Sequence, residues 1–368
     1  MSWQLIIDLA LIALFVGSIP LIYSAYKGKL DNLNKFVWVL IFLTFDLILF
    51  GAFTRLTDSG LGCPDWPGCY GHSNPLLAMG NIKEAEKLMP FGPVTVSKAW
   101  IEMLHRYFAS GLGFLVLILN FLTWKRRKEY GIKIFYVSFG LFLLICLQGA
   151  FGAFTVTMKL QPIIVTFHLM FALLLLVCLT VLSNLTRDNL QSLKPRNYLP
   201  IIPLGVFAIV FSQVFLGAWV STNYAVLACN GFPSCNGEWL PNMDFLNGFT
   251  WWRELGKTST GEYLNIEALV AIHWTHRVGA IITFATVITF IVYLKKISTQ
   301  ANEAWQLQSK YWIKFVLVIL FAQLLSGMSN VIFNWPLIAA LCHTGGASAL
   351  LIGISKLLLL SFQRPLIK

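Results

Sequence analysis

The chain alternates between long apolar runs and polar connections. An apolar run of about 20 residues crosses a hydrocarbon core as a helix. We expect nine such spans, at 4–24, 36–54, 100–123, 133–156, 162–183, 199–220, 266–294, 311–333 and 336–359. A helix satisfies its own backbone hydrogen bonds, and the alternation typical of barrel strands is not visible. The pattern therefore predicts an all-α polytopic membrane protein.

The first span resembles a retained helix more than a signal peptide. It has no basic residue before it, Asp8 interrupts it, and no obvious small-residue cleavage pattern follows it. We therefore expect it to stay in the protein with its N-terminus outside. The segment also lacks the composition of a transit peptide, which favours a bacterial membrane over an organelle.

Composition supports the membrane class and argues against nucleic acid as a partner. The chain is 57% hydrophobic and 12% charged, whereas soluble domains carry about 25% charged residues. Its net charge of +11 comes from basic residues that lie between apolar runs. This distribution is the one that sets membrane topology, and it does not form a basic face for nucleic acid.

The basic residues predict the orientation of the chain. With alternating spans, one side carries 18 basic residues: Lys27, Lys29, Lys35, Lys125, Arg126, Arg127, Lys128, Lys133, Arg187, Lys194, Arg196, Lys295, Lys296, Lys310, Lys314, Lys356, Arg364 and Lys368. The other side carries six: Lys83, Lys87, Lys98, Lys159, Arg253 and Lys257. The richer side is expected to be cytoplasmic. We predict a multi-pass protein of the bacterial cytoplasmic (inner) membrane, with the long connections 57–99 and 221–265 on the periplasmic face.

The two halves of the chain repeat each other. Residues 51–69 read GAFTRLTDSGLGCPDWPGC and residues 217–235 read GAWVSTNYAVLACNGFPSC, each with two Cys six positions apart. Each half also has a His-Arg step and a Gln that lies 20 positions before a later His. Both halves start on the same side, which predicts a parallel repeat. We expect two four-helix bundles, at 36–184 and 199–360, and an anchoring or packing helix within 1–30.

Four histidines occupy equivalent places in the repeat. They lie about six to ten residues inside their spans near the outer end: His105, His168, His276 and His343. A polar side chain in a membrane helix is costly and needs a partner. Two imidazoles facing each other in a bundle suit the axial positions of haem iron, although hydrogen-bonded structural histidines are an alternative. A closed zinc site fits poorly, because it needs four converging N or S ligands.

The neighbours of these histidines differ between the halves. Glu102 stands one helical turn before the first-half ligand candidate, and His273 stands one turn before its second-half equivalent. A carboxyl group there is suited to proton or charge transfer, and a carboxylate solvated at the interface is the alternative. Arg106 and Arg277 directly follow ligand candidates. They are candidates to meet haem propionates, or alternatively to reach lipid headgroups.

The outward connections each contain a Cys pair, Cys63 with Cys69 and Cys229 with Cys235. The outside of a bacterial membrane is oxidising, so two local disulfides are the favoured interpretation. A redox-active pair or reduced thiols remain alternatives. The other three Cys lie within spans and are interpreted as packing residues.

The combined motifs resemble the haem A synthase family over about residues 36–360. The resemblance rests on TRLTDSGLGCPDWPGC (54–69), EMLHR (102–106), His168, HWTHR (273–277) and His343. It implies that the N-terminal half binds the substrate haem O through His105 and His168, with Glu102 catalytic. It also implies that His276 and His343 hold a haem b cofactor in the C-terminal half.

The same resemblance implies an oxidoreductase that makes haem A for respiratory oxidase assembly. Two successive hydroxylations would convert one methyl group of haem O into a formyl group, with haem supplying the redox chemistry. The implied partners are haem O, the farnesyltransferase that produces it, a redox partner and membrane lipid. The sequence leaves homo-oligomerisation open.

Two other classes compete with the synthase. A bis-histidine haem electron-transfer cytochrome would also need four membrane histidines, but the difference between Glu102 and His273 argues against it. A haem transporter would use a parallel repeat, yet every ligand candidate lies near one membrane face.

Overall fold

The computed structural model describes residues 3–26, 32–186, 201–298, 301 and 303–362 of the 368-residue chain. Some of the basic residues that predicted the membrane orientation lie outside these ranges, namely Lys27, Lys29, Arg187, Lys194, Arg196, Arg364 and Lys368. The predicted first and last domains also extend slightly beyond them, at 27–30 and 199–200.

Nine helices in the described ranges are long and apolar enough to cross a membrane. They are α1 (Trp3–Tyr26), α2 (Leu33–Leu56), α4 (Val96–Lys125), α6 (Ile132–Thr157), α7 (Pro162–Leu185), α8 (Ile201–Thr222), α10 (Ile266–Ser298), α11 (Glu303–Ile332) and α12 (Leu337–Ser361). This confirms the predicted all-α polytopic class and the nine predicted spans.

Several helices continue beyond the hydrophobic run that predicted them. α11 begins at Glu303 and α4 at Val96, several residues before the predicted starts. At the start of α4, the Thr95 side chain accepts a hydrogen bond from the Lys98 backbone and caps the helix. Hydropathy marks only the part of a helix that is apolar, so these polar first turns were missed.

The connections contain short helices that the apolar pattern did not predict. They are α3 (Met79–Leu88), α5 (Arg127–Tyr130), the 3-10 helix η2 (Ala225–Leu227) and α9 (Phe245–Gly248). Each is shorter than a membrane span, so a search for apolar runs of membrane length does not find it.

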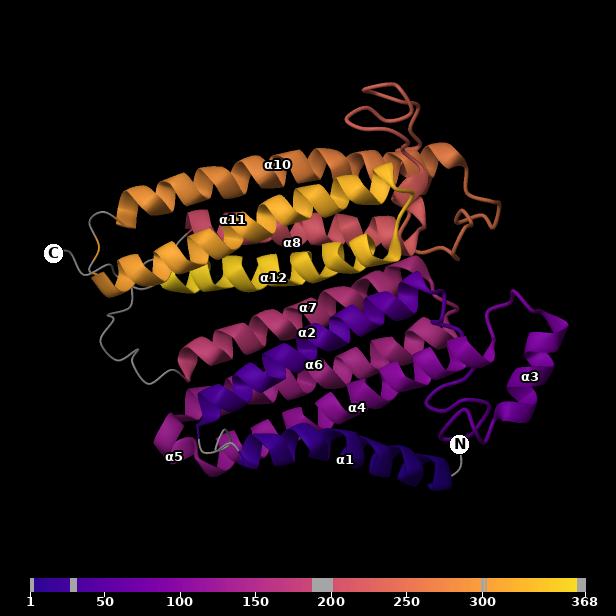
Figure 1. Ribbon diagram of the computed structural model, residues 1–368, viewed down its shortest axis with the longest axis horizontal. Helices are drawn as coiled ribbons and strands as arrows, with labels where there is room; N and C mark the ends of the chain where they lie inside the picture. Colours follow the sequence, from indigo (N-terminus) through magenta and orange to yellow (C-terminus); the bar gives the residue numbers. More distant parts are fainter. Residues whose placement is uncertain (1–2, 27–31, 187–200, 299–300, 302, 363–368) are drawn as a thin grey trace. The chain divides into compact units, whose positions relative to one another are not determined.

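The first compact unit, residues 1–186, contains a four-helix bundle and one additional helix. In the bundle, α2 packs against α4 and α7, and α6 packs against the same two helices. α4 and α7 are therefore diagonal. α1 lies outside the bundle along α4 (Figure 1).

The α1–α4 contact depends on two glycines. A Cβ added to Gly17 would lie 2.6 Å from the ring of Phe114, and one added to Gly111 would lie 2.8 Å from Val16. Small residues at such crossings let membrane helices approach closely. Gly17 and Gly111 thus allow α1 to dock.

The second unit, residues 187–368, has the same adjacency. α8 packs against α10 and α12, and α11 packs against the same two helices, so α10 and α12 are diagonal (Figure 1). The order α8, α10, α11, α12 thus matches α2, α4, α6, α7, as the repeat predicts. The exact domain limits at 36–184 and 199–360 stay predictions.

Candidate functional site

Each bundle carries its two candidate ligands on diagonal helices. His105 of α4 and His168 of α7 are close enough to interact electrostatically. The same is true of His276 of α10 and His343 of α12. All four are six to ten residues from the helix ends nearest the Cys-containing loops. At 1.5 Å per residue, this is a depth of about 9–15 Å along each helix.

Every candidate ligand packs against a glycine of the neighbouring helix. A Cβ added to these glycines would lie close to the imidazole, at 3.1 Å for Gly51 and His105, 3.4 Å for Gly152 and His168, 2.9 Å for Gly217 and His276, and 3.2 Å for Gly327 and His343. At three of the four glycines the distance is below ordinary contact. The glycines therefore leave space that the imidazole edges occupy.

Glutamine amides hold the backbones of three ligand candidates. The Nε2 atoms of Gln148 and Gln323 donate to the carbonyls of His168 and His343, at 2.9 and 2.7 Å. Gln213 donates to the carbonyl of His276 at 2.9 Å. The repeated spacing of 20 residues between Gln and His thus corresponds to a hydrogen bond between neighbouring helices.

Glu102 connects the first bundle to the first disulfide loop. It is buried, its Oε2 accepts from the backbone N–H of Cys63 at 2.8 Å, and its Oε1 accepts from Arg106. Arg106 also donates through Nη1 to the carbonyls of Asp65 and Gly68, at 2.9 and 2.6 Å. The carboxylate and the guanidinium thus hold this loop over α4.

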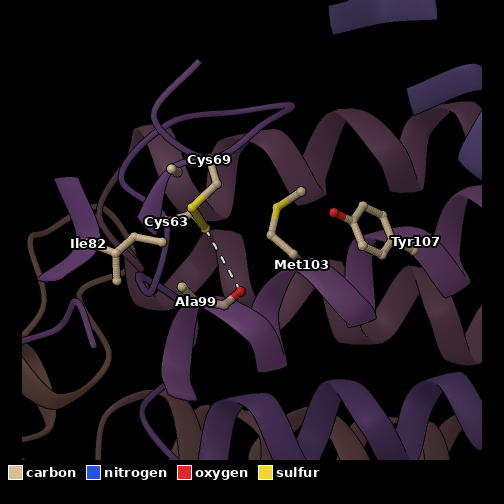
Figure 2. Packing of buried hydrophobic residues seen from close by; sticks show 7 residues of the cluster. Cys63, Cys69, Ile82, Ala99, Met103 and Tyr107 are labelled. Atoms are coloured by element: carbon tan, nitrogen blue, oxygen red, sulfur yellow. Dashed lines mark hydrogen bonds between the residues drawn. A yellow bond between two sulfur atoms is a disulfide. The ribbon is translucent and has the colours of Figure 1, made fainter. Parts of the chain in front are cut away.

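Cys63 and Cys69 form a disulfide, which confirms the predicted pairing. Figure 2 shows the disulfide above Ala99 and beside Met103. The Cys63 sulfur lies 3.9 Å from the Ala99 carbonyl oxygen. Residues of α1 pack against the same cluster, and Ser73 of the loop donates to Asp8 of α1 at 3.2 Å. The additional helix therefore supports the first loop as well as α4.

The second loop is held in a similar way by different chemistry. Cys229 is disulfide-bonded to Cys235, as predicted. The backbone nitrogen of Cys229 lies 3.4 Å from Nδ1 of His273, and the Arg277 Nε lies 3.3 Å from Nε2 of the same ring. Arg277 donates to the carbonyls of Gly231 and Cys229 at 2.9 and 2.6 Å. A neutral imidazole accepts at only one nitrogen, so His273 binds its loop less fully than a carboxylate does.

A buried cation stabilises the rest of the second connection. Arg253 donates to the Asn223 side chain and to the carbonyl of Lys257, and it lies over the ring of Trp219. Burial lowers the pKa of the Arg253 guanidinium below its usual range. This contact joins the loop to the end of α8.

The donor geometry suits haem better than a structural metal ion. Within the described ranges no three His, Cys, Asp or Glu side chains cluster closely enough to hold a metal ion. Two imidazoles on diagonal helices instead match an axial pair for haem. The glycines, which leave room for the imidazole edges between the helices, fit the same group.

Two polar contacts to the imidazoles were not predicted from sequence. Ser326 lies 2.9 Å from Nδ1 of His343, and Gln213 lies 3.0 Å from Nδ1 of His276. The sequence marks Ser326 only by its place in the repeat, directly before Gly327.

Comparisons with known proteins agree on one family. Residues 34–354 match the family model described as cytochrome oxidase assembly protein (COX15-CtaA). The haem A synthase of Shewanella oneidensis is 39% identical over 86% of this chain and 94% of its own length. That of Halalkalibacterium halodurans is 26% identical over 81% and 86%, respectively, and that of Shouchella clausii is 31% identical over 54% and 62%.

Proposed function

Since the chain belongs to the family of cytochrome oxidase assembly proteins that includes the haem A synthases, we propose that it converts haem O to haem A. The reaction oxidises one methyl group of haem O to a formyl group, in two successive hydroxylations, and provides haem A for respiratory oxidases. The observation that carries this function is the pair of diagonal imidazoles in each bundle, with a buried carboxylate beside only one pair.

The two bundles have different roles. The N-terminal bundle binds haem O through His105 and His168, and the C-terminal bundle binds a haem b cofactor through His276 and His343. Haem supplies the redox chemistry that breaks a methyl C–H bond. The difference between Glu102 in the first bundle and His273 at the equivalent position of the second bundle supports this assignment.

Glu102 is the proposed catalytic residue. It lies one helical turn from His105 on the same face of α4, so its carboxylate would be a neighbour of a group that this imidazole holds. A carboxylate there can accept a proton or stabilise positive charge at the reacting carbon. The Cys63 N–H and Arg106 keep the carboxylate in place, and burial limits access of water.

Arg106 and Arg277 have a double role. Both guanidinium groups donate to loop carbonyls, and a guanidinium has five N–H donors in total. The remaining donors are proposed to meet the propionates of a bound haem, since a guanidinium forms charge-assisted hydrogen bonds with carboxylates.

The charge distribution and the disulfides support the orientation of the protein. The chain is proposed to act in the bacterial cytoplasmic membrane with both disulfide loops on the outer face, because disulfides persist in oxidising compartments. The proposed partners are the haem O-producing farnesyltransferase and a redox partner.

Haem extraction tests the function directly. Cells that make haem O are grown with and without this protein, and their haems are separated by chromatography and identified by mass. We expect haem A, or its hydroxylated precursor, only with the protein. Unchanged haem O beside a haem-loaded protein, with a competent redox partner present, would instead identify an electron-transfer cytochrome.

A further inference from the structure

In the C-terminal bundle, the imidazole of His343 is held at the ring nitrogen that would face away from iron. The Oγ of Ser326 on α11 lies 2.9 Å from His343 Nδ1. The same Oγ lies 2.8 Å from the carbonyl oxygen of Ala322, one turn earlier on α11. Ser326 therefore connects the helix backbone to the imidazole.

The two contacts can both be hydrogen bonds at the same time in only one arrangement. A hydroxyl has one proton, and a carbonyl oxygen can only accept, so the Ser326 O–H donates to Ala322. The lone pairs of Oγ then accept from Nδ1–H of His343. With the proton on Nδ1, the lone pair of the ring is on Nε2, which is the form that binds a metal.

The second imidazole of this bundle has a polar neighbour as well. The amide nitrogen of Gln213 lies 3.0 Å from Nδ1 of His276 and donates to the carbonyl of the same residue. This double contact restrains the rotation of the His276 ring relative to its own backbone. An amide nitrogen only donates, so the contact makes Nδ1 of His276 an acceptor and does not place the ring proton there. Both imidazoles of the C-terminal bundle are thus oriented by side chains of neighbouring helices.

The N-terminal bundle lacks both groups at the equivalent positions. The repeat aligns Ser326 with Phe151 and Gln213 with Leu47. Phe151 packs edge-on against Phe171, with ring centroids 4.9 Å apart. His168 Nδ1 is buried and has no hydrogen-bond partner among the described residues.

We infer that Ser326 is a positioning residue that keeps haem resident in the C-terminal bundle, whereas Phe151 at the equivalent position leaves the N-terminal site exchangeable. A ligand fixed in the binding tautomer needs no reorganisation and is a stronger donor to iron. An unrestrained imidazole holds iron less firmly, which suits a site that must release product. This inference rests on the proposed assignment of substrate and cofactor halves.

The test measures haem retention by the full-length protein. Ser326→Ala, Ser326→Thr and Ser355→Ala are each made in a His168→Ala background, so that bound haem reports the C-terminal bundle. Ser355 is a matched control on α12, because its buried hydroxyl has no hydrogen-bond partner among the described residues. Haem loss to excess apomyoglobin and the midpoint potential are recorded after purification.

Ser326→Ala should lose haem about 10- to 100-fold faster, the usual effect of removing such a partner. Its midpoint potential should rise, because a weaker imidazole donor stabilises ferric iron less. Ser326→Thr and Ser355→Ala should match the background. Equal haem loss from the alanine variants at positions 326 and 355, or equal impairment of the Ala and Thr variants at position 326, would overturn the inference.

The reciprocal change tests the N-terminal site. In a His343→Ala background, Phe151→Ser should release haem more slowly than Phe151→Ala, since the two variants differ only in a hydroxyl at the position equivalent to Ser326. Equal rates would contradict the inference. If the wild-type protein forms haem A and these tests fail, only the inference falls. A wild-type protein that binds no haem contradicts the proposed function itself.

Discussion

The two disulfide loops are held by the same contacts but with different chemistry. In the first half, the carboxylate of Glu102 accepts from both the Cys63 N–H and Arg106. In the second half, the imidazole of His273 stands between Cys229 and Arg277, at longer distances. The comparison shows that loop attachment needs only an acceptor at this position. A carboxylate adds a negative charge that a neutral imidazole lacks, and this difference is the basis for the proposal that the first half is the catalytic one.

The largest effect is expected from removing that carboxylate. Glu102→Ala should lower haem A formation about 10²- to 10⁴-fold, the usual contribution of a positioned acid or base, while haem still binds. Glu102→Gln is the matched variant, because it keeps an acceptor for the loop but loses the charge. Extracted haem A and the absorption spectrum are measured together.

His273→Ala sharpens the comparison. It should lower the free energy of unfolding by roughly 1 kcal/mol, the net contribution of one hydrogen bond. It should also reduce haem A formation far less than Glu102→Ala does. If Glu102→Gln or Glu102→Ala retained full activity, the carboxylate would only hold the loop, and the two halves would be chemically alike.

The second effect is a loss of cofactor. His276→Ala or His343→Ala should deplete bound haem b, since one axial nitrogen remains and leaves the iron coordination incomplete. Haem content is measured by absorbance after extraction, with Cys342→Ala as a control next to His343. An unchanged haem b content would assign the cofactor to the other half.

The third effect compares two glycines. A Cβ at Gly217 would approach the His276 ring to 2.9 Å, whereas one at Gly152 would lie 3.4 Å from the His168 ring. Gly217→Ala should therefore lower the free energy of unfolding by about 1–3 kcal/mol, because the added methyl group overpacks the contact. It should also change the absorption spectrum of the bound haem. Gly152→Ala should be tolerated, because alanine favours helix. Equal spectra and equal Tm values for both variants would contradict this use of the glycines.

The smallest effect concerns the additional helix. Gly111 faces α1, and the repeat places Ile282 at the equivalent position on α10, where its side chain is exposed. Gly111→Ile should displace α1, lower Tm and reduce haem A modestly, through loss of support for the first loop. Ile282→Ala should change neither. If Gly111→Ile also had no effect, α1 would be dispensable for the loop.

The sequence predicted the elements whose signal is local or periodic. The nine spans follow from run length, and the positions of the candidate ligand histidines and of the Cys pairs follow from the repeat. The contact between Gly217 and His276 was not predicted, because the relative rotation of two helices depends on packing along their full length. The hydrogen bonds from Arg106 to the loop carbonyls were not predicted either, because the return path of the loop is not visible in the local sequence.

The short separation within each Cys pair has a consequence for biosynthesis. Four cysteines allow three pairings, but six positions separate the partners in both disulfides. Closing a short segment costs less entropy than closing a long one, so each bond forms fastest with its own neighbour. With the loops on the oxidising side, as proposed above, the first bond can close while the second half of the chain is still being translated. Mispaired cross-links between the halves are then kinetically disfavoured.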